Sequence, residues 1–239
     1  RVHRRQRQMC IRDRIKSKEG KYFIDEKKYE FKENVIVENP DYKIRSNMMD
    51  YFLNSEITIF YKFSTIITDD YTIFCNEGFY DPEKKIGVFK KDAKVNSESR
   101  TIFGDSIFFD ENKKYASASS NIKIIDEKEN LIIKGEYAEV FEELDSALIT
   151  KNPVAINITK TDSLFIKADT LISLGTSQNR KVIGYYNVKF IKGSMSGKSD
   201  KIKIDKSEGL TTLSRNDLTK RQIQILSENE INKINPVIW

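Results

Sequence analysis

The chain has 239 residues, of which 38% are hydrophobic, and its formal net charge is +5. This length allows one large all-β domain with a sizeable core, and no apolar run is long enough to cross a bilayer. Residues 1–14 hold six arginines and one aspartate, whereas the remaining chain carries 35 basic and 35 acidic side chains. The excess charge therefore belongs to this tail alone, so we expect no nucleic-acid partner and no transmembrane segment.

The basic tail has no apolar periodicity, and no apolar segment of the kind found in secretory signals follows it. Its string RRQRQMCIRD (4–13) resembles one reading frame through the transposase adapter of short-read sequencing libraries. We therefore expect residues 1–14 to be a non-native or disordered tail that is dispensable for folding. The natural N-terminus, with any signal peptide, is then expected to be missing from this sequence.

The rest of the chain is built from a repeat of about thirty residues. The segments KIRSNMMDYF (43–52), TIFCNEGFYD (72–81), TIFGDSIFFD (101–110), IIKGEYAEVF (132–141) and FIKADTLISL (165–174) share one frame. Its origin is a small residue, at Ser17, Ser46, Cys75, Gly104, Gly135, Ala168 and Ser199, and the intervals are 29 to 33 residues. In six of these seven units an isoleucine stands two residues before the origin, and Gly197 is the exception.

Apolar residues alternate with polar ones within each unit, which is typical of a strand with one buried face. The apolar phase moves from even offsets, as at Ile102, to odd offsets, as at Ile107 and Phe109. A one-residue change of phase is what a β-bulge produces. We therefore predict a bend next to the Asn or Asp that follows each origin, and a sheet that curls.

Short polar turns follow these strands, at DPEKK (81–85), DENKK (110–114), EELD (142–145) and DKSEG (205–209). Such turns favour antiparallel hairpins, so each repeat should hold two strands. Return strands are indicated by ENVIV (33–37), SSNIKII (119–125), KNPVAIN (151–157) and YYNVKFI (185–191), with Pro153 at a strand start or edge. Residues 215–233 are predicted to be an insertion, with one short helix capped by Asn216 or Asp217.

Catalytic and metal-binding chemistry has little support outside the tail. Removing the tail removes the only histidine, His3, so histidine-based triads and histidine metal sites are excluded. The remaining cysteine, Cys75, occupies a small-residue origin and is interpreted as a buried side chain rather than a nucleophile. We expect no enzyme activity, no catalytic or metal-ligating residues, and no cofactor.

The pattern I-x-[small]-[D/N]-x-x-[apolar]-x-[Y/F], followed by a turn and N-V-x-[VIF], resembles the OstA-like lipopolysaccharide-transport family. The resemblance covers residues 15–239 and is clearest in GEYAEVFEELDSALITKNPVAI (135–156). That family comprises the periplasmic bridge protein and the N-terminal domain of the outer-membrane assembly protein. The resemblance implies an all-β, open antiparallel jellyroll, a V-shaped rolled sheet with two strands per repeat, located in the periplasm or at the outer membrane.

The resemblance further implies that the lipid A acyl chains of lipopolysaccharide lie in an apolar groove. We assign its lining to the periodic apolar positions Ile44, Met49, Tyr51, Ile73, Tyr80, Ile102, Ile107, Phe109, Ile133, Val140, Ile166 and Leu171. The departures at Ser173, Gly197 and 215–233 predict an interruption of the groove near its C-terminal end. The chain stops inside a predicted strand, so we expect a fragment cut at both ends.

Two functions remain open at this point. The favoured one is a lipid carrier that forms part of a periplasmic bridge and adds other OstA-like jellyrolls to its edge strands. The alternative is a structural or adhesive β-solenoid with a packed, ligand-free core. Hairpin-connected antiparallel strands favour the carrier, whereas parallel coils with stacked side chains favour the solenoid.

Overall fold

A computed structural model describes residues 14–159, 162–176, 178–215 and 224–225, and every regular element in these ranges is a β-strand. The first ten strands are β1 (Arg14–Lys16), β2 (Glu19–Phe23), β3 (Lys28–Glu38), β4 (Lys43–Phe52), β5 (Thr58–Phe60), β6 (Ser64–Ile67), β7 (Thr72–Cys75), β8 (Glu77–Asp81), β9 (Ile86–Asn96) and β10 (Thr101–Asp110). The others are β11 (Tyr115–Asp126), β12 (Leu131–Phe141), β13 (Ser146–Thr150), β14 (Val154–Asn157), β15 (Leu164–Lys167), β16 (Thr170–Leu174), β17 (Lys181–Lys192), β18 (Met195–Asp205), β19 (Leu210–Ser214) and β20 (Gln224–Ile225).

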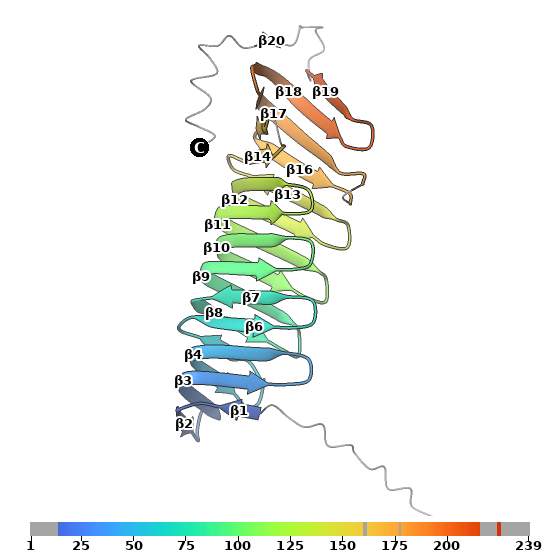
Figure 1. Ribbon diagram of the computed structural model, residues 1–239. Helices are drawn as coiled ribbons and strands as arrows, with labels where there is room; N and C mark the ends of the chain where they lie inside the picture. Colours follow the sequence, from blue (N-terminus) through green and yellow to red (C-terminus); the bar gives the residue numbers. More distant parts are fainter. Residues whose placement is uncertain (1–13, 160–161, 177, 216–223, 226–239) are drawn as a thin grey trace, which may run out of the picture.

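The strands stack like rungs of a ladder, from β1 and β2 at one end to β18 and β19 at the other (Figure 1). Sheet A has the order β2-β3-β4-β5-β8-β9-β10-β11-β12-β13-β16-β17-β18-β19. Sheet B has the order β1-β3-β4-β6-β7-β9-β10-β11-β12-β14-β15-β17-β18-β20. Both sheets are antiparallel throughout. The long strands run through both sheets, which confirms the predicted rolled sheet with two strands per repeat.

The two sheets meet where the long strands bend. Between β3 and β4 the register shifts, so that Glu33 and Asn34 lie opposite the single residue Asn47. Both Glu33 and Asn34 have positive φ angles, of 56° and 54°. The same pairing of two left-handed residues recurs at Lys91–Asp92, Ser120–Asn121, Lys151–Asn152 and Tyr186–Asn187. Asn and Asp tolerate this backbone region better than most residues. The bend is confirmed at the Asn or Asp that follows the origin, but the two left-handed residues lie opposite it on the return strand, as Glu33 and Asn34 lie opposite Asn47.

Burial changes phase at the bend, as the sequence pattern predicts. In β4, Ile44 and Ser46 are buried on one side of Asn47, and Met49 and Tyr51 are buried on the other. The bulge rotates the strand by one position, so the face that points inward in sheet B continues inward in sheet A. The result is one continuous apolar core enclosed between the two sheets.

Small residues at two of the repeat origins have close neighbours beside the bend. A Cβ atom added to Gly135 would lie 2.6 Å from Cγ2 of Ile149, on the next strand of sheet A. Ser46 at the same position is within hydrogen-bond distance of Ser64, with 2.8 Å between the two hydroxyl oxygens. Burial raises the pKa of the Cys75 thiol to about 12, so this origin residue stays a neutral thiol.

The predicted hairpin turns are confirmed, and aspartates close them. Oδ1 of Asp81 accepts a hydrogen bond from the backbone N–H of Lys84, and Oδ1 of Asp110 accepts one from Lys113, both at 3.0 Å. This bond from an Asp side chain to a nearby backbone N–H stabilises a tight turn. Pro153 directly precedes β14, where it needs no ladder donor.

Some predictions concern residues near the chain ends. Of the predicted tail, residues 1–13 lie outside the described residues, and Arg14 begins β1, where it pairs with Glu38. Of the predicted insertion at 215–233, the structure describes Arg215 and strand β20, which pairs with β18. The helix expected after Asn216 or Asp217 and the return strand expected at 234–239 lie outside the described residues.

Candidate functional site

All twelve residues assigned to the groove lie in the continuous core between the sheets. Their exposed fractions range from 0% to 7%. They are Ile44, Met49, Tyr51, Ile73, Tyr80, Ile102, Ile107, Phe109, Ile133, Val140, Ile166 and Leu171. In this structure the core is filled by these side chains over most of its length. Contact between these residues and an acyl chain stays a prediction.

On the side of the roll opposite the bends, the turns of sheet A face the loops of sheet B. We call this side the seam. Large side chains from the loops of sheet B close the seam in its first repeats. Tyr42, Tyr71 and Arg100 stand four residues before successive repeat origins, and each is at most 8% exposed. The ring of Tyr42 lies edge-on to Tyr80, with 5.9 Å between the centroids. The jellyroll is therefore open in topology but covered along this stretch.

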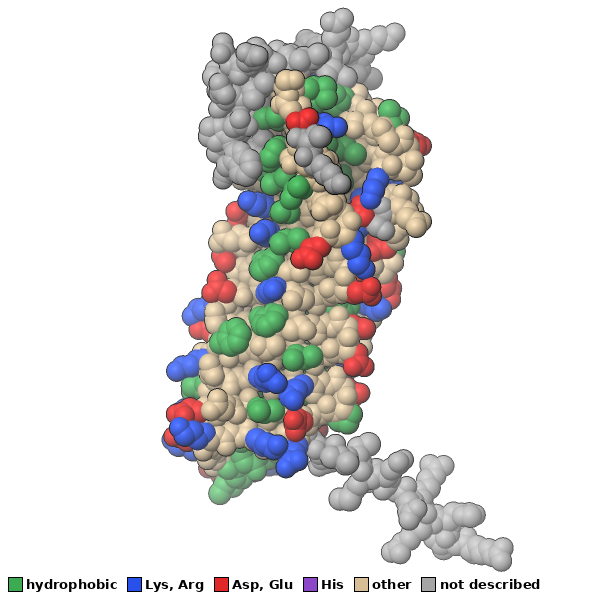
Figure 2. Space-filling model, in the orientation of Figure 1, with side chains coloured by type: hydrophobic (Ala, Val, Ile, Leu, Met, Phe, Trp, Pro, Cys, Tyr) green, Lys and Arg blue, Asp and Glu red, His purple; other side chains and the backbone are tan. Residues whose placement is uncertain are grey.

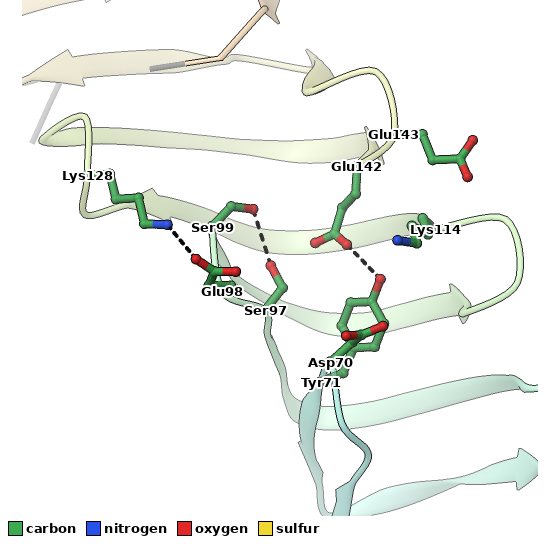
Figure 3. Close-up of a pocket in the computed structure, with 9 residues that line it drawn as sticks. All are labelled: Asp70, Tyr71, Ser97, Glu98, Ser99, Lys114, Lys128, Glu142 and Glu143. Carbon is green, nitrogen blue, oxygen red and sulfur yellow. Dashed lines mark hydrogen bonds and ion pairs between the residues drawn. The ribbon is translucent and has the colours of Figure 1, made fainter. Parts of the chain in front are cut away.

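Tyr71 bridges the seam most directly. Its hydroxyl donates a hydrogen bond of 2.7 Å to Oε2 of Glu142, in the turn between β12 and β13 (Figure 3). Burial, followed by this hydrogen bond, raises the pKa of Tyr71 well above its usual range. The contact joins residues 71 apart in the sequence, and it lies in a polar pocket of about 290 Å³. That pocket is lined by Asp70, Tyr71, Ser97, Glu98, Ser99, Lys114, Lys128, Glu142 and Glu143.

A buried ionic cluster follows at the next repeat. Nη2 of Arg180 donates to Oδ2 of Asp126 at 2.8 Å, and Nε of Arg100 lies 3.9 Å from the same oxygen. Burial, then repulsion from Arg180, lowers the pKa of Arg100. Nη1 of Arg180 also lies 3.4 Å from Oγ of Ser173. Ser173, which departs from the apolar repeat, therefore faces a guanidinium group instead of the core.

Beyond this cluster the space between the sheets opens into a cleft of about 750 Å³. Its apolar lining comes from sheet B through Leu131, Ala155, Leu164 and Ile166, and from sheet A through Val182 and Ile204. Its polar lining includes the cations Lys128, Arg180, Lys192 and Lys206 and the acids Glu129 and Asp205. A volume of this size is typical of pockets that bind small molecules.

The cleft marks where the repeat pattern changes. At the position four residues before the origin, Leu131 and Leu164 replace the tyrosines and the arginine of earlier repeats. Gly197 breaks the isoleucine series because the ring of Phe190 occupies the space of a side chain, only 2.5 Å from where a Cβ atom would stand. The sequence predicted an interruption of the groove near its C-terminal end, but the structure instead opens into the cleft there.

Sequence reasoning found one of the cleft residues, Ile166, and missed the others. The missed signal was the position four residues before each origin, which is large in every repeat from Tyr42 to Met195. The other eleven assigned residues do not line this cleft. On the outer surface, the face shown in Figure 2 carries a broken line of hydrophobic side chains between lysines and arginines.

The described ranges were also searched for a metal site and for a membrane-spanning helix. They contain no group of three or more His, Cys, Asp or Glu side chains placed to hold a metal ion. They also contain no helix that is long and apolar enough to span a membrane.

Comparisons with known proteins give one kind of match. No family model matches this chain, and no curated protein sequence matches it. Among solved structures, the chain is similar to the crystal structure of LptH from Pseudomonas aeruginosa, with 13% sequence identity and a TM-score of 0.31. The alignment covers 66% of this chain and 94% of LptH. LptH is described as the LptA homologous periplasmic component of the conserved lipopolysaccharide transport device.

Proposed function

We propose that this chain binds the lipid part of lipopolysaccharide and forms part of a periplasmic bridge that delivers it to the outer membrane. The observation that carries the proposal is the cleft of about 750 Å³, in which apolar walls from both sheets meet four cations and two acids. This division suits an amphiphile with acyl chains and an anionic head. Each buried methylene group contributes about 0.8 kcal/mol, so a single chain of ordinary length is held firmly.

Movement of lipid along the roll requires the seam to open. In the covered repeats the predicted lining, such as Ile133 and Phe109, packs against side chains of the opposite sheet, and Tyr71 bridges to Glu142. We propose that the cleft is the resting site and that these contacts part as the lipid passes. The lipid then passes through the packed repeats and stays bound in the cleft.

A photo-crosslinking residue placed at Ile166 tests the resting site. We expect crosslinking to lipopolysaccharide at Ile166, weaker crosslinking at Ile133 and Phe109, and none at the exposed turn residue Asn112. Crosslinking at Asn112 alone would show that the groove is wrongly assigned. Crosslinking at Ile166 without any at Ile133 or Phe109 would indicate a binding protein rather than a conduit.

The sheet edges support assembly into a bridge. Among the described strands, β1 and β2 pair only with β3, and β19 and β20 pair only with β18. Unpaired edges are templates for strand addition, so we propose head-to-tail contacts with other jellyrolls. Successive N–H groups of an edge strand point in opposite directions. Proline placed in turn at Thr211 and Thr212 should therefore weaken association in light scattering at one of the two positions only.

A ligand-free, structural solenoid is the second candidate, and the packing of the twelve predicted residues favours it. The antiparallel pairing of all described strands instead supports the carrier, because a solenoid of parallel coils would stack identical side chains. Mass spectrometry of the protein purified from a lipopolysaccharide-producing periplasm discriminates between the two. Retained lipid A supports the carrier, and lipid-free protein with no crosslink at Ile166 supports the solenoid.

A further inference from the structure

The outer face of sheet B carries a row of lysines that the lipid-binding proposal does not use. Backbone pairing places one residue of each strand directly beside the next, from Lys94 on β9 through Phe103 on β10 to Lys198 on β18. Six of the eight residues in this row are lysines, and none is acidic. We call these lysines the basic strip: Lys94, Lys123, Lys134, Lys167, Lys189 and Lys198. Side chains alternate between the two faces of a strand, and neighbours of the strip such as Val95 and Ile124 belong to the core, so the strip faces outward.

The strip places like charges side by side. Lys123 pairs directly with Lys134, and Lys189 pairs directly with both Lys167 and Lys198. Like charges directly opposite each other on neighbouring strands destabilise a sheet. Among the described residues, no carboxylate forms an ion pair with Lys123, Lys134, Lys167 or Lys189. The fold therefore carries a repulsion that its own acids do not offset.

The outer face of sheet A is arranged differently. There Lys21 pairs with Glu30, and Lys90 pairs with Glu77. Outside the tail the chain holds equal numbers of basic and acidic side chains. The excess positive charge of the strip is therefore a local feature of sheet B, and an anionic partner would offset it.

The shape of the strip indicates what kind of anion fits. Exposed acids such as Asp105 and Glu136 lie two residues from the row on the side of the bends. Neutral residues such as Thr101 and Ile125 lie two residues away on the other side. The positive charge is thus one residue wide, and strands about 4.8 Å apart make it about 34 Å long. This line matches an extended polyanion, whereas a membrane surface would also meet the bordering carboxylates.

A hollow lined by aromatic rings lies at one end of the strip. Its volume is about 440 Å³, and its lining includes Phe63, Phe74, Phe103 and Asp105. Nζ of Lys94 lies over the rings of Phe74 and Phe103, at 5.3 Å and 5.4 Å from their centroids. The apolar face of a sugar ring packs on an aromatic ring, and sugar hydroxyl groups donate hydrogen bonds to carboxylates. The hollow therefore suits a sugar unit beside the first lysine of the strip.

We propose that the outer face of sheet B binds a linear acidic polysaccharide, with its anionic groups along the basic strip and a sugar ring in the aromatic hollow. The strip adjoins the bends, whereas the polar residues of the cleft, such as Lys128 and Lys206, lie at the seam on the opposite side of the roll. The head group of a lipid in the cleft is therefore not the ligand of the strip. The partner is a separate glycan chain, and this inference does not depend on the proposed lipid binding.

Binding of fluorescently labelled oligogalacturonate to the full chain, followed by anisotropy, tests the proposal. This probe is linear and carries a carboxylate on every sugar, and a labelled dextran oligomer of the same length is the neutral control. We expect only oligogalacturonate to bind, and its affinity should fall as salt rises because bound counterions are released. The arginines of residues 1–14 also attract polyanions, so the decisive comparison is between variants that all keep this tail.

Two matched pairs of variants assign the binding to the strip and to the hollow. Replacing Lys123 and Lys134 together by Gln should weaken oligogalacturonate about tenfold at low salt. The same change at Lys21 and Lys90, both exposed on the outer face of sheet A, should leave binding unchanged. Phe103→Leu keeps the charge and should weaken binding about fivefold, whereas Phe79→Leu on sheet A should not. The double lysine variant removes a repulsion, so it should be at least as stable as the unchanged protein in urea unfolding.

Each alternative has its own result. Equal losses in the two lysine variants would show that the tail or the net charge binds the probe, and would overturn the strip as the site. A loss in the strip variant with none in Phe103→Leu would overturn the sugar assignment. Binding of phosphatidylglycerol vesicles in place of oligogalacturonate would make this face a membrane surface and overturn the glycan. Crosslinking at Ile166 tests the lipid in the cleft independently of all these results.

Discussion

Replacing Asp126 with Asn tests the ionic cluster that separates the packed repeats from the cleft. The Asp126 side chain is 6% exposed, and the side chains of Arg100 and Arg180 are 3% and 8% exposed. The change keeps the size of the side chain but removes the only carboxylate within 3 Å of either guanidinium in the described ranges. It leaves Arg180 beside a neutral amide, while Arg100 keeps Asp145 as an ion-pair partner, with 3.9 Å between Nη2 and Oδ1.

The expected cost follows from burial. Removing one partner of a buried ion pair costs about 3–5 kcal/mol, because the remaining charge stays desolvated. Asn keeps one oxygen, which can still accept from Arg180 or from the backbone N–H of Glu129, so we expect the lower end, about 3 kcal/mol. For a protein of this size that lowers the melting temperature by about 6–12 °C.

Urea unfolding followed by far-ultraviolet circular dichroism measures this loss. Asp105 supplies the matched control, since it is exposed at a bend and is bonded to Asn121 at 2.7 Å. Asp105→Asn should change the free energy of unfolding by about 0.5 kcal/mol or less. A cost for Asp126→Asn within that same range would refute the view that the carboxylate neutralises two buried arginines.

Three further changes probe the seam and the tail. Tyr71→Phe removes the hydroxyl that bonds to Glu142 and should cost about 1.5 kcal/mol in urea unfolding, whereas no loss would mean that the seam contact does not hold the sheets together. Burial raises the pKa of Glu111 above its ordinary 4.5. The native state therefore loses stability as the pH rises from 4.5 to this raised pKa, and the loss stays constant at higher pH. Glu111→Gln should therefore melt higher than the unchanged protein at pH 7 and equally at pH 4, and a constant difference across a pH series would contradict this. Deleting residues 1–13 should leave the melting temperature unchanged, and a loss of several degrees would show that they belong to the fold.

The sequence by itself determined the repeat, the bends and the turns. Strand alternation has a period of two, so the change from Ile44 to Met49 could be read as a bulge without any knowledge of partners. Aspartates such as Asp81 and Asp110 marked turns because their bonds reach only three residues along the chain. These features depend on neighbours in sequence, and the structure places them as predicted.

Only the tertiary structure decided which parts of the apolar face are filled and which are hollow. Asp126 and Arg180 are 54 residues apart, and Tyr71 and Glu142 are 71 apart, so their contacts depend on how far the two sheets are staggered along the roll. That stagger sums the twist of many strands, and no local pattern encodes it. The sequence therefore predicted an inward face at Ile166 and Ile133 alike, but only Ile166 borders the cleft.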